Sequence, residues 1–235
     1  MRFFIMMCLI LTGCESSATT ITIPKGAPKV EIIGEIDGAV IAQASKVRKL
    51  AKAGVSEIHM LINSPGGAVM PGMVFIDAMK AAQAQGVKFK CYTTVMAASM
   101  AYVIYSQCDE RYAFENARLL FHPMGISTRG SRVQELAAEL AQTQKEEEVL
   151  MAKLREDLKL DWKTFHTNYF AETFWQAARL KDIAPHFLEI IVDVDGFETD
   201  IYIFEKPRSL FDFILPTTNA ILTRFKGIME GTNAN

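Results

Sequence analysis

The sequence predicts an α/β fold in which helices pack on a largely parallel sheet. Two predicted strands, Val30–Ile36 and Ile58–Ile62, flank a predicted helix at Ala39–Ala53, whose apolar residues recur at helical spacing. A strand–helix–strand order of this kind implies a parallel strand pair joined by a right-handed crossover. The 235 residues are 50% hydrophobic and 22% charged, which suits one sizeable globular domain with its own core.

The same alternation continues beyond the first crossover. Gly54 ends the first helix, and the Asn63–Gly67 turn directly follows the second strand. The next predicted elements are a helix at Ala68–Gln85, a strand at Phe89–Val95, a helix at Met100–Tyr105, and short strands at Arg111–Phe114 and Leu119–Phe121. A long amphipathic helix, Ser131–Leu158, completes the predicted body of the fold.

The composition excludes several function classes. A formal net charge of −2 gives no reason to expect a nucleic acid or an anionic surface as partner. Four cysteines and four histidines stand without metal-ligand spacing, so no zinc site and no other cofactor is predicted. Cys91 and Cys108 could form a disulfide in an oxidising compartment, but sequence alone does not bring them within reach.

The N-terminal segment reads as a targeting signal. Arg2 precedes an apolar run, Phe3–Leu11, that is too short to span a bilayer as a mature helix. Leu11–Cys14 resembles a bacterial lipobox, in which the cysteine becomes the lipidated N-terminus. We therefore expect a lipoprotein of the bacterial cell envelope, anchored to the membrane at Cys14. The alternative is a cytoplasmic protein with an apolar N-terminus.

Ser99 is the candidate nucleophile. It is a hydroxyl among small and apolar residues, between a β-rich run and an apolar helical run. A serine at a strand-to-helix turn projects its oxygen from the backbone, and the N–H groups of the turn favour negative charge there. This environment suits a nucleophile whose reaction creates an oxyanion.

The glycines of the preceding turn, Gly66 and Gly67, have a matching use. A backbone that presents N–H groups to a substrate carbonyl leaves no room for Cβ atoms. Taken alone, the same residues favour an ordinary strand-to-helix turn. Their order ahead of Ser99 favours the functional interpretation.

His122 is the candidate general base. It stands at the end of an apolar strand and before Pro123, whereas His59, His166 and His186 lack such a context. An imidazole titrates near neutrality, so it can take a hydroxyl proton and return it to a leaving amine. A lone histidine is more often structural, and the motif context decides here.

Three stretches carry a family resemblance. Ser64–Gly67, Met96–Ala101 and Asn116–Pro123 resemble, in this order, the three signature stretches of the proteolytic subunit of the Clp protease. The resemblance covers about Val30 to Asp182. It implies a ClpP/crotonase-like fold of repeated β-β-α units. It also implies a serine endopeptidase that forms an acyl-enzyme on Ser99, with His122 as base and the amides of Gly67 and Met100, beside Gly66, holding the oxyanion.

The third member of the triad matches less well. The family has an aspartate before an aromatic residue, where this chain has Asn168, and a register shift of one residue gives Thr167. An asparagine can orient an imidazole but cannot stabilise imidazolium as a carboxylate does. We expect a slower enzyme, or one that recruits Asp161 or Asp182 instead.

The resemblance also implies partners. In the family, the region of Ser131–Leu158 is a protruding handle that interlocks two rings, so a homo-oligomeric ring is implied. Peptides or unfolded proteins are the implied substrates, delivered by an ATPase unfoldase. An envelope location, where no ATP is available, argues against that unfoldase. The chemistry itself needs no metal and no nucleotide.

The expected organisation has four parts: a signal segment at 1–14, a tether at 15–28 with a short strand at Thr20–Ile23, a peptidase domain at 29–185 and an appendage at 186–235. The appendage is predicted as a hairpin, in which Leu188–Val194 and Phe197–Phe204 flank an Asp195-Gly196 turn, followed by a helix at Thr218–Met229.

Other functions stay open. Signal-peptide peptidases of the Ser-Lys group share the fold but use a lysine base, and the His122-Pro123 pair argues against them. Acyl-CoA enzymes of the crotonase group share the architecture without requiring Ser99 or His122. A ring scaffold that has lost turnover would explain the missing aspartate.

Overall fold

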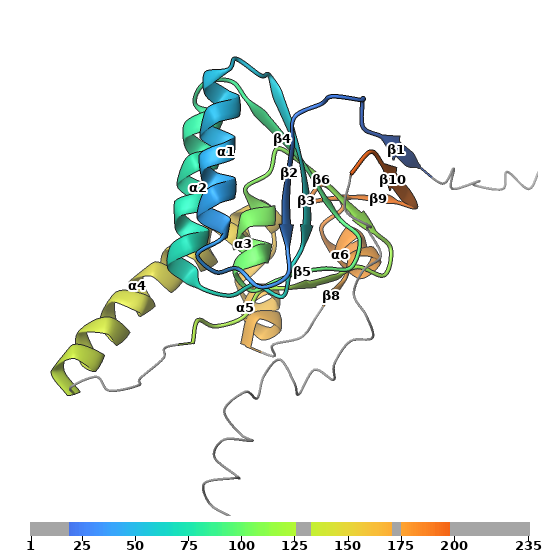
Figure 1. The fold of residues 1–235 in the computed structure, drawn as a ribbon. Coiled ribbons are helices and arrows are strands. Elements are labelled where there is room, and N and C mark those ends of the chain that lie inside the picture. Colours follow the sequence, from blue (N-terminus) through green and yellow to red (C-terminus); the bar gives the residue numbers. More distant parts are fainter. Residues whose placement is uncertain (1–18, 126–132, 171–174, 198–235) are drawn as a thin grey trace, which may run out of the picture. The chain divides into compact units, whose positions relative to one another are not determined.

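The fold is centred on a five-stranded parallel sheet. The computed structural model describes residues 19–125, 133–170 and 175–197. The sheet has the order β2-β3-β4-β6-β9 (Figure 1). Its strands are β2 (Lys29–Ile33), β3 (Glu57–Asn63), β4 (Lys88–Thr93), β6 (Glu110–Phe114) and β9 (Glu189–Ile191). The predicted α/β class and the predicted parallel pair of the first two strands are confirmed.

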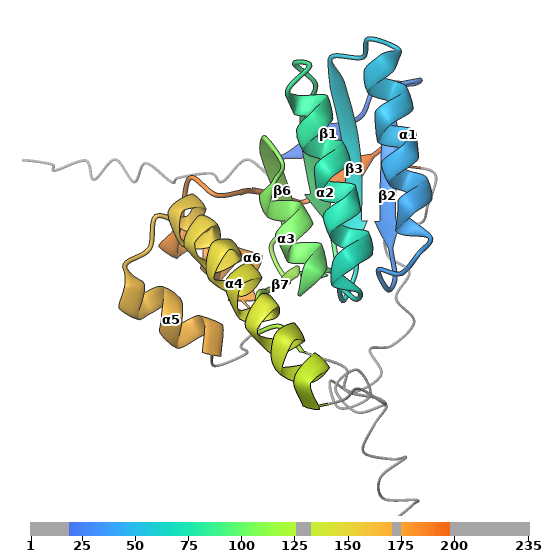
Figure 2. The ribbon, with the colours of Figure 1, turned by 90° about the vertical axis from the view of Figure 1, so that its left-hand side faces the viewer.

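Two helices cover one face of this sheet. α1 (Val40–Lys52) and α2 (Val69–Gln83) lie side by side against it, as Figures 1 and 2 both show. α1 buries Val40, Ala44, Val47 and Ala51, and this spacing places them on one side of a helix. The apolar residues whose helical spacing predicted α1 from sequence thus form the face of the helix that meets the core.

A second, smaller sheet adjoins the first and positions the candidate nucleophile. It contains β5 (Met96–Ala98), β7 (Arg118–Leu120) and β8 (Trp175–Gln176) in the order β5-β7-β8. α3 (Met100–Ser106) follows β5, and all seven of its residues are buried. A helix that is apolar on all sides belongs in a core, which agrees with its predicted sequence pattern.

The long predicted helix is present as α4 (Val133–Leu158). Its C-terminal end buries Leu154 and Leu158, whereas Leu140 and Val149 are exposed. α5 (Trp162–Phe170) and α6 (Ala177–Ile183) follow, and α5 lies beside the C-terminal half of α4 (Figure 2). Within the described residues, no helix combines the length and apolarity that a membrane crossing requires.

The predicted C-terminal hairpin differs from the structure in its first arm. The run Leu188–Val194 forms two strands instead of one, because β9 pairs in parallel with β6 while β10 (Asp193–Asp195) pairs in parallel with β1 (Thr20–Thr22). Each half of the run thus has a different pairing partner. The second arm after Phe197 and the predicted helix Thr218–Met229 lie outside the described residues, as does Cys14.

Cys91 and Cys108 form a disulfide in the core. Their Cα atoms are 6.1 Å apart, and both side chains are buried. Cys91 lies in β4 and Cys108 lies just after α3, so the bridge fastens the helix that begins after Ser99 to the main sheet.

Candidate active site

Ser99 occupies a strained turn between β5 and α3. Its backbone has φ 54° and ψ −127°, a region that residues with a side chain rarely adopt. Its side chain makes no capping hydrogen bond to the helix, although serine commonly caps helices. The fold therefore holds the Ser99 backbone in an unfavourable conformation, and the Ser99 hydroxyl does not cap the helix that follows. Both features are typical of a catalytic nucleophile.

Asn63 fixes the approach to this turn. Its side-chain oxygen accepts hydrogen bonds of 3.0 Å from the backbone N–H groups of both Thr94 and Val95. Its amide nitrogen donates to the Thr94 hydroxyl at 2.8 Å. Asn63 is 3% exposed, so these bonds are shielded from water and fix the start of β5.

The glycine loop packs directly against Ser99. A Cβ atom on Gly66 would lie 2.5 Å from the Ser99 Cβ and 2.6 Å from the Ala98 carbonyl oxygen, closer than real contacts allow. Gly66 has φ +96° and Gly67 has φ +145°. Glycine is thus required at Gly66 both by the backbone conformation and by the approach to Ser99.

The glycine loop pairs with two other segments of the chain. The carbonyl of Gly66 accepts from the N–H of Ile36, and the N–H of Ala68 donates to the carbonyl of Ile36. Ser64 pairs with Ala97 of β5. Met100 begins α3, where the first N–H groups have no acceptor within the helix. The role of the Gly67 and Met100 amides as oxyanion donors stays a prediction.

His122 follows β7, the strand that pairs with β5. β5 and β7 are parallel, with Ala98 opposite Leu120, and the N–H of Ser99 donates to the carbonyl of Leu120 at 2.7 Å. His122 follows Leu120 by two residues, at the same end of the sheet, and is half-buried. Among the described residues there is no hydrogen bond between the Ser99 hydroxyl and the His122 ring. The topology therefore brings the two residues to one sheet edge without joining their side chains.

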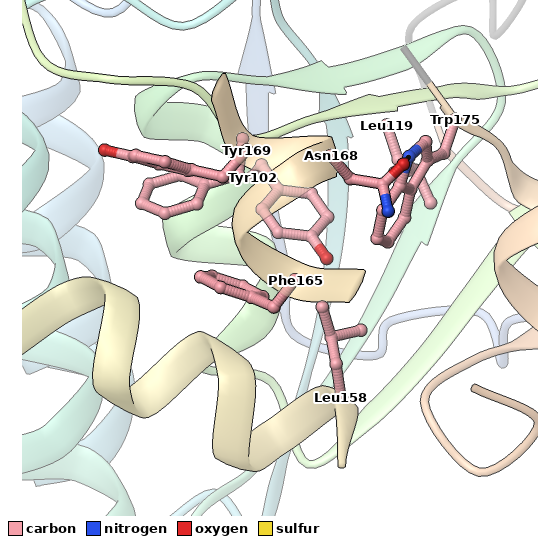
Figure 3. A pocket seen from close by; sticks show the side chains of 8 residues that line it. Tyr102, Leu119, Leu158, Phe165, Asn168, Tyr169 and Trp175 are labelled. Carbon is pink, nitrogen blue, oxygen red and sulfur yellow. Dashed lines mark hydrogen bonds between the residues drawn. The ribbon is translucent and has the colours of Figure 1, made fainter. Parts of the chain in front are cut away.

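The sequence-based candidates for the third member have other partners. Asn168 donates to the backbone carbonyl of Thr164 at 2.7 Å, and its side-chain oxygen accepts from the Trp175 indole at 3.2 Å. Figure 3 shows its amide directed at Trp175, within an otherwise aromatic and aliphatic pocket. In this arrangement the amide orients Trp175, and its role towards His122 stays a prediction.

The alternative residues are engaged elsewhere or exposed. Asp161 accepts from the N–H of Thr164 at 3.0 Å at the start of α5, and the Thr164 hydroxyl and N–H lower the pKa of its carboxyl. Asp182 lies on the surface of α6, 3.9 Å from Arg179. Thr167 is exposed on α5. Within the described residues, no three histidine, cysteine or carboxylate side chains converge as a metal site.

Sequence reasoning missed two parts of this site. β5 has three residues, which is too short for a periodic pattern to reveal, yet it delivers Ser99. Asn63 was grouped with the glycine loop, but its hydrogen bonds to the turn before β5 could not be derived from sequence. A polar residue at the end of an otherwise buried strand was the available signal.

Comparison with known proteins identifies the family of this chain. The family model described as Clp protease matches residues 29–181, which is more than half of the chain. The curated relatives include a Rhodococcus jostii protein named "ATP-dependent Clp protease proteolytic subunit 2", 34% identical over 101 residues that cover 41% of this chain and 50% of that protein.

Two further relatives show the same pattern. An Oryza sativa protein named "ATP-dependent Clp protease proteolytic subunit" is 34% identical over 101 residues, 41% of this chain and 44% of that protein. A Streptococcus mutans protein of the same name is 33% identical over 110 residues, 43% of this chain and 54% of that protein. The chain thus spans about half the length of the curated relatives it matches. From the extent of the family match and the order of its motifs, this chain belongs to the Clp protease family.

Proposed function

We propose that the protein is a serine endopeptidase of the Clp type, with Ser99 as nucleophile and His122 as general base. The observation that carries this proposal is the backbone of Ser99, at φ 54° with the glycine loop packed against it. Strain of this kind persists only where the surrounding structure maintains it, and a hydroxyl with no capping role supports a chemical use.

The proposed reaction proceeds through an acyl-enzyme. His122 takes the proton of the Ser99 hydroxyl as its oxygen bonds to the scissile carbonyl carbon. The tetrahedral intermediate collapses as His122 gives that proton to the leaving amine, and the C–N bond breaks. Water then attacks the ester, with His122 again as base, and Ser99 is released with its proton restored.

The amides of Gly67 and Met100 are the proposed oxyanion donors. The loop that contains Gly67 packs against Ser99 through Gly66, and Met100 is the first residue of the helix that follows Ser99. Preorganised backbone donors around a nucleophile typically contribute about 10²–10³ in kcat. The proposal assigns no polar partner to His122. Asn168, the sequence-based candidate, bonds to Thr164 and Trp175.

Labelling with a fluorophosphonate probe tests the proposal. We expect modification at Ser99, with complete loss in Ser99→Ala and at least about 10³-fold slower labelling in His122→Ala. Hydrolysis of a fluorogenic peptide should fall in parallel. A folded protein that the probe leaves unmodified would contradict the peptidase function.

A scaffold that has lost turnover is the second candidate. It is favoured by one observation, that Asn168, the residue aligned with the family's acid, bonds to Trp175. A homo-oligomeric ring is proposed for both candidates by family membership, and peptides or unfolded proteins are the proposed substrates of the peptidase. The scaffold predicts a ring without probe labelling or hydrolysis, whereas the peptidase predicts all three.

The proposed location is the bacterial cell envelope, with a lipid anchor at Cys14. The Cys91–Cys108 disulfide supports an oxidising compartment, since disulfides are rare in the cytosol. Mass spectrometry of the N-terminal peptide tests the anchor, with acyl chains on Cys14 as the expected result. An unmodified N-terminus with reduced cysteines in cells would support a cytoplasmic protein, in which an ATPase partner becomes possible.

A further inference from the structure

The residues that flank His122 in the chain contact side chains of both α4 and α5. Glu147 of α4 accepts a hydrogen bond of 3.1 Å from the backbone N–H of Met124, two residues after His122. The same carboxylate oxygen accepts from the hydroxyl of Tyr169 in α5. Tyr169 in turn packs on Phe121, the residue before His122, with ring centroids 4.9 Å apart. His122 is therefore flanked on both chain sides by residues that Glu147 and Tyr169 hold.

The chemistry of the contacts fits a positioning role. Burial and the hydrogen bond to Glu147 raise the pKa of Tyr169, so its phenol stays protonated and donates to the carboxylate. Hydrogen bonds to a charged acceptor are about twice as strong as neutral ones. Met124 follows Pro123, which has no N–H, so the Met124 amide is the first backbone donor after His122.

The contacts continue to the helix that Ser99 precedes. Phe121 stacks on Tyr102 of α3 with centroids 6.3 Å apart. Figure 3 shows Tyr102 and Tyr169 lining one side of the same pocket. The segment 121–124 is thus held between α3 on one side and α4 and α5 on the other.

We propose that Glu147 is a positioning residue for His122, acting through the Met124 amide and the Tyr169 hydroxyl. The inference rests on the proposed peptidase function. The contacts of Glu147 and Tyr169 with the neighbours of His122 explain how His122 is held, although no side chain among the described residues hydrogen-bonds to its ring.

Glu147→Ala tests this proposal against Glu148→Ala, which removes the adjacent, exposed carboxylate of the same helix. Wild-type labelling of Ser99 is established first, because its absence would overturn the peptidase function and not this inference alone. We expect Glu147→Ala to lower kcat and the labelling rate by about 10- to 100-fold, with KM within about twofold, since misplacement of a base impairs chemistry more than binding. Glu148→Ala should stay within about twofold in every parameter.

Two conservative variants separate positioning from folding. Glu147→Gln keeps an acceptor oxygen and should recover most of the lost kcat, and Tyr169→Phe keeps the ring packing and should lose less than Glu147→Ala. Melting temperatures identify any unfolded variant. The proposal is overturned if folded Glu147→Ala turns over and labels at the wild-type rate. It is also overturned if Glu147→Gln is as impaired as Glu147→Ala while both are folded.

Discussion

Ser99 and His122 lie at the ends of neighbouring parallel strands, yet the molecule holds them by different means. Ser99 is held chiefly by main-chain contacts, namely a strained backbone and the glycine loop, and backbone N–H groups of the turn before β5 donate to the Asn63 side chain. The His122 side is fixed by side chains of distant helices, chiefly Glu147 and Tyr169. A nucleophile held by backbone tolerates few substitutions nearby, whereas a base held by side chains can be adjusted from elsewhere in the chain.

Gly66→Ala should produce the largest loss of activity, because it directly disrupts the main-chain contacts that hold Ser99. The new Cβ would lie 2.5 Å from the Ser99 Cβ, at a φ of +96° that alanine disfavours. We expect labelling of Ser99 to slow by at least about 100-fold. Rates of fluorophosphonate labelling measure this, with circular dichroism to show that the protein is folded.

Gly86→Ala is the matched control for that variant. Gly86 has a similar φ of +88°, but a Cβ there would meet no atom within 4 Å. It should cost about 1 kcal/mol of backbone strain and leave labelling within about twofold. Equal labelling rates in Gly66→Ala and Gly86→Ala would remove the argument that the glycine loop shapes the site.

Removal of the disulfide tests whether the position of Ser99 also depends on the cross-link between β4 and the end of α3. The double variant Cys91→Ala, Cys108→Ala opens a loop with a sequence separation of 17, which should lower the free energy of unfolding by about 3 kcal/mol. Peptidase activity should stay within about twofold at temperatures where the protein is folded, since the backbone around Ser99 is unchanged. Urea unfolding measures the first effect, and a stability equal to that of the wild type would contradict it.

Asn168→Ala tests the His122 side. Its amide bonds to Thr164 and to the Trp175 indole, so we expect kcat to fall less than about tenfold, with a stability loss of about 1 kcal/mol. Steady-state kinetics and urea unfolding measure the two effects. A fall of about 10³-fold in a stably folded variant would instead identify Asn168 as the third member of the triad.

The carboxylates can be compared in the same assay. Asp161→Asn and Asp182→Asn each remove one of the two carboxylates that the sequence offers in place of the family's aspartate. Because Asp161 caps α5 and Asp182 lies on the surface of α6, we expect kcat within about threefold of the wild type in both variants. A fall of about 10³-fold in kcat at unchanged KM would instead identify that carboxylate as the acid that supports His122.

The smallest expected effect is on stability, and it concerns a histidine that lies in neither the Ser99 turn nor the segment around His122. His59 is buried in β3, where its ring contacts the Glu57 carboxylate at 2.9 Å and the Tyr92 hydroxyl at 2.9 Å. Burial lowers the pKa of His59 below 6.5, although Glu57 acts to raise it. The unfolded chain therefore binds a proton more readily than the folded one, and stability falls as the pH drops below about 6.5.

Melting temperatures at pH 8 and at pH 5.5 measure this dependence. We expect a decrease in the wild type that is smaller in His59→Gln, which has no titratable ring at this position. An identical pH dependence in the wild type and His59→Gln would show that His59 does not titrate on unfolding.

The two sides also differ in how far sequence could predict them. The turns at Ser99, Gly66 and Gly67 could be predicted because they depend on local sequence. Ser99 stands between a strand and a helix, and glycines allow a positive φ and a close approach of the backbone. The hydrogen bonds of Asn168 were not, because they depend on how α5 packs beside β8. The run Leu188–Val194 likewise reads as one strand, and only tertiary pairing divides it between two sheets.

A crystal structure of the protein with a phosphonate bonded to Ser99 tests the central claim most directly. We expect the phosphonyl oxygen within hydrogen-bond distance of the Gly67 and Met100 amides, and the His122 ring within reach of the Ser99 oxygen. An adduct oxygen that points away from both amides, or a His122 ring turned away from Ser99, would contradict the proposed mechanism.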